Sequence, residues 1–356
     1  MAKQHNNFLT AIDVGSAKTC ALMAELAEGG LRYRGHGLAE SSGSRKGVIV
    51  DLDKAVAAIQ KAVEACEDVA GAPVEHAIVG IGGAHVRGVN SHGGISLGTR
   101  PHEIGRDEIK QAVERARAIP LPADREVLHL LPQEFILDDQ AGVHDPLGMM
   151  AARLEVRVHL VTVAASAAQN VITAVNRAGV HVDDTVFEPL GAADSVLRAD
   201  ERELGVCLAD IGAGSTELIV FVQGAVAYTG VIPVGGDHFT SDLSVGMCTA
   251  LAEAEKIKKV YGNAIVTLIP EGNEVEVPRW ATALRACCRN GSWRKFSSRG
   301  RANYLRCCAK LCGRAACSTR AWRALCSAEE VRGCREFSTC RNRCCGGRCG
   351  CRGLLH

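Results

Sequence analysis

Two short segments carry the residues best suited to chemistry. Residues 13–19 read Asp-Val-Gly-Ser-Ala-Lys-Thr, and residues 210–216 read Asp-Ile-Gly-Ala-Gly-Ser-Thr. The Asp, the first Gly and the Thr recur at one constant offset of 197 positions. We call these segments the first and second Asp-Gly turns. Their candidate binding residues are Asp13, Gly15, Ser16, Lys18, Thr19, Asp210, Gly212, Gly214, Ser215 and Thr216.

The chemistry of the two turns favours a nucleotide held between them. Glycines let backbone N–H groups approach phosphate oxygens closely, and Lys and hydroxyl side chains add further donors. Carboxylates at this place would repel phosphate unless Asp13 and Asp210 together hold a hydrated Mg²⁺. A single Asp-Gly turn is typical of an ordinary hairpin. Two copies with flanking strands instead indicate a duplicated domain with a phosphate site.

Three further features are candidates for the same cleft. Glu188 precedes a Pro at a strand-to-helix junction and could orient an attacking water, or it could be a plain first-turn carboxylate. Gly235 and Gly236 enter a helix and could turn N–H groups toward phosphate. Glu253 and Lys256 share one helix face and could hold ribose hydroxyls, or they could form a surface ion pair.

Strand and helix patterns explain how the turns are positioned. Apolar strands are predicted on both sides of each turn, and residues 84–163 form a separate β/α insertion with strands at 86–89 and 94–97. The other predicted strands are 8–14, 20–26, 76–83, 126–137, 153–163, 181–187, 205–209 and 218–222, and the predicted helices are 52–70, 106–118, 167–178 and others beginning near 188, 238 and 252.

The pattern resembles the actin/Hsp70/sugar-kinase superfamily, and within it the FtsA family of bacterial actin-like cell-division proteins. The words that carry the resemblance are TAIDVGS at 10–16, LPQEF at 131–135, DPLGM at 145–149 and PVGGD at 233–237. Two of them lie in the insertion, which in this family replaces a subdomain of actin. The resemblance covers residues 1 to about 278.

The resemblance implies an α/β fold of duplicated, actin-like (ribonuclease H-like) domains. It places domain 1 at residues 1–83 and 164–200, the insertion at 84–163, and an incomplete domain 2 at 201–278. It implies binding of ATP and Mg²⁺, with Glu188 as the candidate catalytic carboxylate of at most a weak ATPase. A sugar or acetate kinase and a pilus-assembly actin homologue remain alternatives on the same fold.

The resemblance also implies partners and a location. Such proteins form head-to-tail filaments of themselves, anchor the FtsZ ring at the cytoplasmic face of the inner membrane, and recruit later division proteins through the insertion. The family attaches peripherally to the membrane by a C-terminal amphipathic helix, which we do not find in this chain. No signal peptide and no apolar run of membrane-spanning length is present, so the four thiols before position 279 are expected to stay reduced.

Composition changes abruptly at Pro278. The chain has 41 Lys+Arg and 40 Asp+Glu, but residues 279–356 hold 18 of the basic and only 3 of the acidic residues. That tail carries a net charge of +15 and 13 of the 17 cysteines, whereas the preceding part is acidic at −14. The nearly balanced charge of the whole chain therefore hides a boundary between two parts of different composition.

Three interpretations compete for residues 279–356. A zinc module needs thiolates paired at a regular spacing, but the tail has no Cys-x-x-Cys, and the nearest match to it is Cys-x₃-Cys. A basic nucleic-acid arm leaves the thiols unexplained, so no nucleic-acid partner is expected. A reading-frame shift near codon 279 accounts best for the Arg, Cys and Trp content. The tail is then expected to be disordered or poorly folded, domain 2 to lack sheet strands, and ATP binding to be weak or absent.

Overall fold

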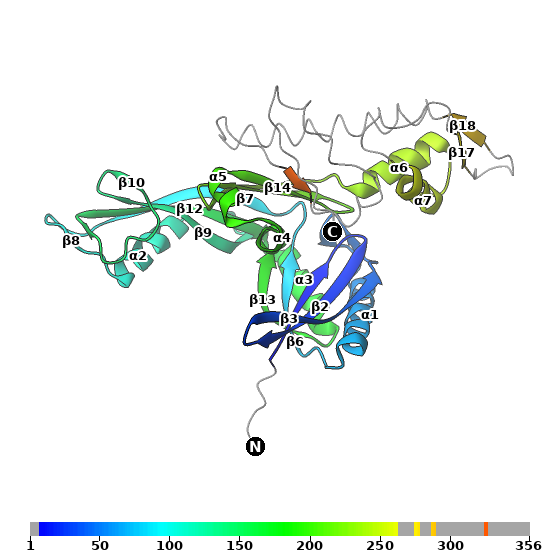
Figure 1. Cartoon of the computed structure of the whole chain (residues 1–356), viewed down its shortest axis with the longest axis horizontal. Helices are drawn as coiled ribbons and strands as arrows, with labels where there is room; N and C mark the ends of the chain where they lie inside the picture. The colour runs from blue at the N-terminus through cyan, green and yellow to red at the C-terminus, as the bar shows by residue number, and fades with distance from the viewer. Residues whose placement is uncertain (1–6, 263–273, 278–285, 290–323, 327–356) are drawn as a thin grey trace, which may run out of the picture.

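The structure, a computed structural model, describes residues 7–262 and three short strands beyond them, at 274–277, 286–289 and 324–326. Figure 1 shows a lower lobe, an upper lobe above it, and a third part that projects to the left. The lower lobe contains the first Asp-Gly turn. The upper part contains the second turn, and the projecting part is the predicted insertion.

The first lobe is a five-stranded sheet in the order β13-β6-β1-β2-β3. An antiparallel hairpin of β1 and β2 encloses the first Asp-Gly turn, and β6 and β13 run parallel to β1. A short ribbon of β4 and β5 follows β3. The bounds are β1 Phe8–Val14, β2 Lys18–Ala27, β3 Gly30–Glu40, β4 Ser44–Arg45, β5 Val48–Ile49, β6 His76–Ile81 and β13 His181–Phe187.

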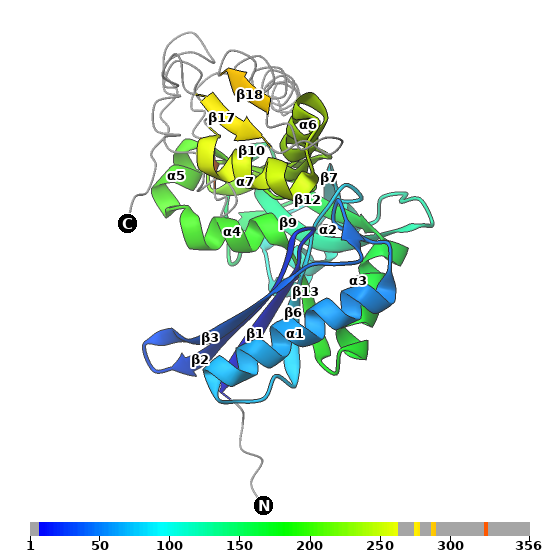
Figure 2. The same cartoon turned by 90° about the vertical axis from the view of Figure 1, so that its right-hand side faces the viewer.

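Helices α1 (Leu52–Ala70) and α3 (Ala165–Arg177) run side by side along this sheet (Figure 2). Helix α1 begins where the Asp51 side chain accepts a hydrogen bond from the Lys54 N–H, and it ends at Gly71 with a φ of 69°. A residue with a side chain would be strained in that left-handed cap. The observed bounds confirm the predicted helix 52–70.

The insertion has a sheet of its own in the order β10-β9-β12-β7, covered by α2 (Arg106–Arg117). Two strands were predicted at 86–89 and 94–97, but this was wrong, because one continuous strand β7 spans Arg87–Ser96. Gly93 lets α2 approach, since a Cβ there would collide with the backbone of Ala112 and Ala116. The other strands are β8 His102–Glu103, β9 Arg125–Leu137, β10 Gln140–Val143, β11 Met150–Ala151 and β12 Arg153–Ala164.

The second lobe repeats the hairpin of the first. Its sheet has the order β16-β15-β14-β19, and the second Asp-Gly turn joins β14 to β15. The strands are β14 Val206–Ile211, β15 Thr216–Val222, β16 Ala225–Ile232, β17 Glu274–Val277, β18 Ala286–Arg289 and β19 Ala324–Cys326, and the helices are α4 Glu188–Val196, α5 Ala199–Leu204, α6 Gly236–Met247 and α7 Leu251–Tyr261.

Polar contacts connect the insertion to the second lobe. Buried His159 of β12 lies between Asn90 Oδ1, 2.5 Å from its Nδ1, and Thr229 Oγ1, 2.9 Å from its Nε2. Gln133 Nε2 donates to the backbone oxygen of Val226 at 2.8 Å. These contacts hold the insertion against β16.

The predictions about the tail concern residues that are almost all outside the described part of the chain. Within it, β17 pairs with β18, and β19 pairs in parallel with β14. The four cysteines of residues 7–262 are free thiols, as predicted. None of the described helices combines the length and apolar character that a membrane span requires.

Candidate functional site

The two Asp-Gly turns face each other across a cleft. They share one hairpin register, in which Val14 pairs with Thr19 and Ile211 with Thr216. A Cβ added at Gly214 would lie 2.7 Å from Ser16 Oγ, so the turns touch. The cavity between them measures about 260 Å³, and it is lined by Asp13, Val14, Gly15, Ser16, Ala17, Lys18, Gly47, Gly83, Glu188, Asp210, Ile211, Gly212, Ala213, Gly214, Ser215 and Glu217.

Hydrogen bonds from the β4–β5 ribbon fix the first turn. Ser44 Oγ donates to the backbone oxygen of Gly15 at 2.9 Å, and Ser16 Oγ accepts from the Gly47 N–H at 3.2 Å. These bonds come from a segment some thirty residues downstream of the turn. The β4–β5 ribbon therefore helps to hold the first turn in place.

Four carboxylates converge on the cleft: Asp13, Glu188, Asp210 and Glu217. Burial raises the pKa of Glu188 well above its usual value, and the charges of the other three raise it further. Burial also raises the pKa of Glu217 to about 8 and that of Asp210 to about 6. The site thus gathers acids that resist ionisation, and a bound cation would stabilise their ionised forms.

Glu217 has a buried carboxylate oxygen that a cation could contact. Its Oε1 accepts a hydrogen bond from the Gly83 N–H, whereas its Oε2 is buried with no partner in the protein. A buried carboxylate oxygen without a partner destabilises the fold unless an ion or water meets it. Among the described residues, these four acids do not form a set whose ligand atoms all lie within 4.8 Å.

Two predicted binding residues have other roles in the structure. Thr19 is buried, and its Oγ1 lies 2.7 Å from Ser41 Oγ. Thr216 is also buried, and its Oγ1 donates to the backbone oxygen of Val234 at 2.8 Å. Neither lines the cavity. The two hydroxyls brace the hairpins, and the predicted donors that do line the cavity are Ser16, Lys18 and Ser215.

The prediction that Gly235 and Gly236 turn N–H groups toward phosphate is not what the structure shows. The Gly236 N–H donates to the backbone oxygen of Gly212, and the Asp237 N–H to that of Ala213, both at 2.9 Å. The Gly235 N–H is bonded to His238 Nδ1 at 3.2 Å. A Cβ at position 235 would collide with the second turn. The glycines therefore let the start of α6 hold this turn from behind.

Glu253 and Lys256 lie on α7, away from the residues that line the cavity. Their side chains form an ion pair at 2.7 Å, with exposed fractions of 35% and 70%. The structure thus shows the surface ion pair, and a role in ribose binding stays a prediction.

Sequence reasoning did not assign a role to Glu217. The repeat places it opposite Asp210, at the position that Cys20 occupies opposite Asp13. It is also the one charged residue in β15, a strand that is buried at every position except its last. A charge in such a strand is rarely buried without a partner. This departure from the repeat was the signal that could have identified it.

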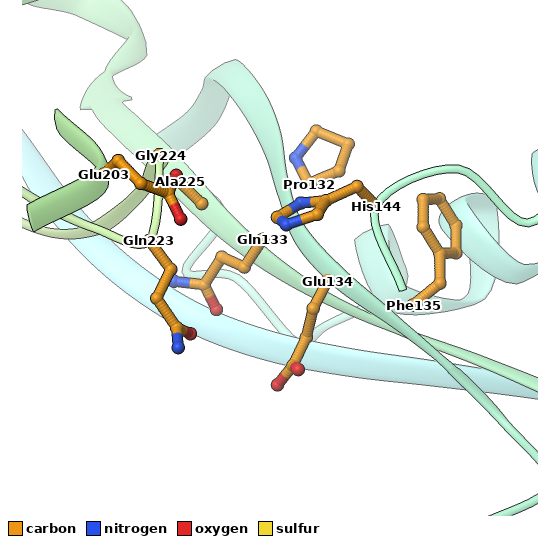
Figure 3. Close-up of a pocket in the computed structure, with 9 residues that line it drawn as sticks. All are labelled: Pro132, Gln133, Glu134, Phe135, His144, Glu203, Gln223, Gly224 and Ala225. Carbon is orange, nitrogen blue, oxygen red and sulfur yellow. The ribbon is translucent and has the colours of Figure 1, made fainter. Parts of the chain in front are cut away.

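A second cavity, of about 400 Å³, lies where the insertion meets the β15–β16 turn (Figure 3). Gln133, Glu134 and His144 line one side, and Glu203 and Gln223 the other. Glu134 is already bonded to Arg157 at 2.6 Å.

Solved structures of the same fold come from several actin-like proteins. A PilM–PilN type IV pilus biogenesis complex matches with a TM-score of 0.62 and 14% identity, over 93% of this chain and 84% of that one. MreB5 of Spiroplasma citri bound to ADP matches with a TM-score of 0.52 and 11% identity, over 94% and 88%. These likenesses confirm the predicted actin-like α/β fold.

Sequence comparison is more specific. The family model for the SHS2 domain inserted in FtsA matches residues 83–162, and that for cell division protein FtsA matches residues 207–285. The FtsA of Pseudomonas aeruginosa is 41% identical over 276 residues, which are 77% of this chain and 66% of that protein. The FtsA of Borreliella burgdorferi is 36% identical over 278 residues, 78% and 67%. The chain spans about two thirds of the length of these relatives, and it belongs to the FtsA family of cell-division proteins.

Proposed function

We propose that this chain binds ATP with Mg²⁺ in the cleft between the two Asp-Gly turns. The observation that carries the proposal is the convergence of Asp13, Glu188, Asp210 and Glu217 on one glycine-lined cavity. Backbone N–H groups of the turns would meet the phosphates, and Asp13, Asp210 and Glu217 would hold the hydrated cation. A solved structure of the same fold, MreB5 of Spiroplasma citri, has ADP bound.

Glu188 would act on water rather than on the cation directly. It begins α4 at the C-terminal end of β13, where its side chain packs against Gly80 and Gly82. The raised pKa favours its protonated form, and a nearby cation would favour the carboxylate that can orient a water. We therefore propose at most slow ATP hydrolysis, with nucleotide-dependent assembly as the main role.

In the cell, we propose that the protein works as a scaffold of the division ring. It would form head-to-tail filaments, anchor the FtsZ ring at the cytoplasmic face of the inner membrane and recruit later division proteins through the insertion. Membership of the FtsA family supports this role. The hydrogen bonds of His159 and Gln133 to the second lobe support it too, because an insertion held in place suits recruitment.

The test is to measure ATP binding by the full chain with calorimetry, once in Mg²⁺ and once in EDTA. Asp13→Asn and Asp210→Asn should each weaken Mg²⁺-dependent binding at least about tenfold, since each removes a charge near the cation. Asp53→Asn is the matched control, because Asp53 is 84% exposed and pairs with Arg177 on α3. Equal binding in EDTA, or no effect of either cleft variant, would contradict the proposal. Co-sedimentation with FtsZ filaments tests the scaffold role separately.

A further inference from the structure

A group of metal-binding side chains lies at the opposite end of the first sheet from the cleft. His76 begins β6, and His181 and Asp183 begin β13. The cleft lies beyond the other ends of these strands, at Gly83 and Glu188. Since a strand rises about 3.3 Å per residue, the group lies about 20 Å from Glu188. It is therefore separate from the proposed nucleotide site.

The sheet itself brings the three side chains together. His76 and His181 are direct partners in the parallel pairing of β6 and β13. Asp183 follows two residues after His181, and its side chain is hydrogen-bonded to that of His76. The register shifts between Val182 and Asp184, which marks a β-bulge at Asp183. Bulges re-aim a side chain, and this one lies within the group.

The candidate ligand atoms lie close to one another, and two of them already share a hydrogen bond. Asp183 Oδ1 lies 2.8 Å from His76 Nδ1 and 4.0 Å from His181 Nε2. The two imidazole rings meet edge to face with their centroids 5.2 Å apart. Among the described residues, this is the one group of three His, Cys, Asp or Glu whose ligand atoms all lie within 4.8 Å.

We propose that His76, His181 and Asp183 bind a divalent transition-metal ion. Two imidazole nitrogens and one carboxylate oxygen suit Zn²⁺, Ni²⁺ or Cu²⁺, whereas Mg²⁺ and Ca²⁺ prefer oxygen ligands alone. All three side chains are at least half exposed, with 60%, 67% and 50% of their surface accessible, so an ion can reach them without unfolding. The remaining coordination positions are open to water.

A metal ion bound to these three residues would stabilise the edge strand of the first sheet. β13 is the last strand in the order β13-β6-β1-β2-β3, and the ion would link its start to the start of β6. A ligand that binds only the folded chain stabilises it. Zn²⁺ should therefore raise the unfolding temperature of the chain, independently of ATP.

The experiment uses the full chain with its thiols alkylated, because 13 cysteines in residues 279–356 would otherwise bind the same ions. Zn²⁺ is titrated while each histidine is followed by diethyl pyrocarbonate modification and peptide mass spectrometry. Modification of His76 and His181 should slow together as Zn²⁺ rises. His102, which lies 3.8 Å from Glu108 but lacks a third ligand, should be unaffected.

Variants provide the second measurement. Loss of a residue behind a ligand already weakens metal binding about 10- to 100-fold, so His181→Ala and Asp183→Asn should each weaken Zn²⁺ binding at least about tenfold. His102→Ala should bind as the wild type does. Asp183→Asn keeps the shape of the strand and covers the case in which His181→Ala fails to fold. Unchanged affinity in Asp183→Asn, or equal slowing at all histidines, would overturn the proposal.

Discussion

The Gly83 N–H donates a hydrogen bond to the Glu217 carboxylate, and this bond joins the first lobe to the second across the floor of the cleft. The two residues are 134 positions apart in the chain. Gly82, next to Gly83, lies against the carboxylates of both Glu188 and Glu217. The space around the two carboxylates therefore depends on Gly82, which has no side chain to fill it.

A Cβ at position 82 should close this part of the cleft. In Gly82→Ala, the methyl group would collide with the carboxylates of Glu188 and Glu217 and would displace them from their present positions. We expect a loss of about 1–3 kcal/mol in the free energy of unfolding, typical of overpacking, and a loss of Mg²⁺-dependent ATP binding. Urea unfolding and calorimetry measure the two effects.

Gly191→Ala is the matched control for this variant. Gly191 lies inside α4, and a Cβ there meets nothing within 4 Å. Because Ala favours helix more than Gly does, this change should stabilise the chain by about 0.5–1 kcal/mol. If Gly82→Ala is as stable as Gly191→Ala and binds ATP equally well, a methyl group at position 82 does not crowd the cleft.

The pKa of Glu217 predicts a pH dependence of stability in the cation-free chain. Its pKa is about 8 when folded against 4.5 unfolded, so the folded state holds one more proton between these values. Stability from this group is therefore complete below about pH 4.5 and falls as the pH rises to about 8. Glu217→Gln, which cannot ionise, should exceed the wild type at pH 8 by at least about 1.4 kcal/mol, the equivalent of one pKa unit.

Comparison of the two proteins across pH isolates this effect from other titrating groups. Urea unfolding in EDTA should show the advantage of Glu217→Gln growing between pH 4.5 and 8. Excess Mg²⁺ should reduce the advantage, because a cation stabilises the ionised carboxylate. An advantage that is constant with pH would show that burial does not shift this pKa.

Local patterns made the first-lobe elements predictable. Helix α1 was predicted at its observed bounds because its apolar spacing and its glycine stop are properties of neighbouring residues. Strand β13 was likewise predicted at 181–187. Strands β3 and β16 were missed. β3 is an edge strand that is exposed along most of its length, so its sequence lacks the apolar alternation of a half-buried strand.

The sequence repeat predicted the two Asp-Gly turns of the candidate site, but not the contacts around them. Both Asp-Gly turns and Glu188 line one cavity, as their types and positions suggested. The partners of Thr216 and Gly236 depend on how α6 docks behind the second turn, which no local pattern reveals. Glu217 acquires its role from Gly82 and Gly83, which come from the other lobe.

The contact between the insertion and the second lobe should weaken in acid. Burial lowers the pKa of His159 to about 4, from 6.5 when unfolded, so the unfolded chain binds the extra proton between these values. Stability from this group is present above about pH 6.5 and is lost as the pH falls toward 4. Thr229→Val removes the partner of Nε2 and should cost about 1–3 kcal/mol at pH 7.

Thr173→Val is the control for the loss of a hydroxyl. Thr173 Oγ1 bonds only within α3, to the backbone oxygen of Gln169 and to the Gln169 side chain, so its loss should change stability by less than about 0.5 kcal/mol. Thermal unfolding at pH 7 measures both variants. A Thr229→Val protein as stable as Thr173→Val would show that His159 does not join the two parts.

Ser215 and Thr216 are neighbours in the second turn, but we expect one to affect ATP affinity and the other to affect the free energy of unfolding. Ser215 lines the cavity, so Ser215→Ala should weaken ATP binding while leaving the free energy of unfolding within about 0.5 kcal/mol of the wild type. Thr216 is buried and bonded to Val234, so Thr216→Val should lower that free energy by about 1–2 kcal/mol. Calorimetry and urea unfolding of both variants check the pair. The reverse assignment, with Thr216 controlling affinity and Ser215 controlling stability, would mean that the second turn presents its other face to the nucleotide.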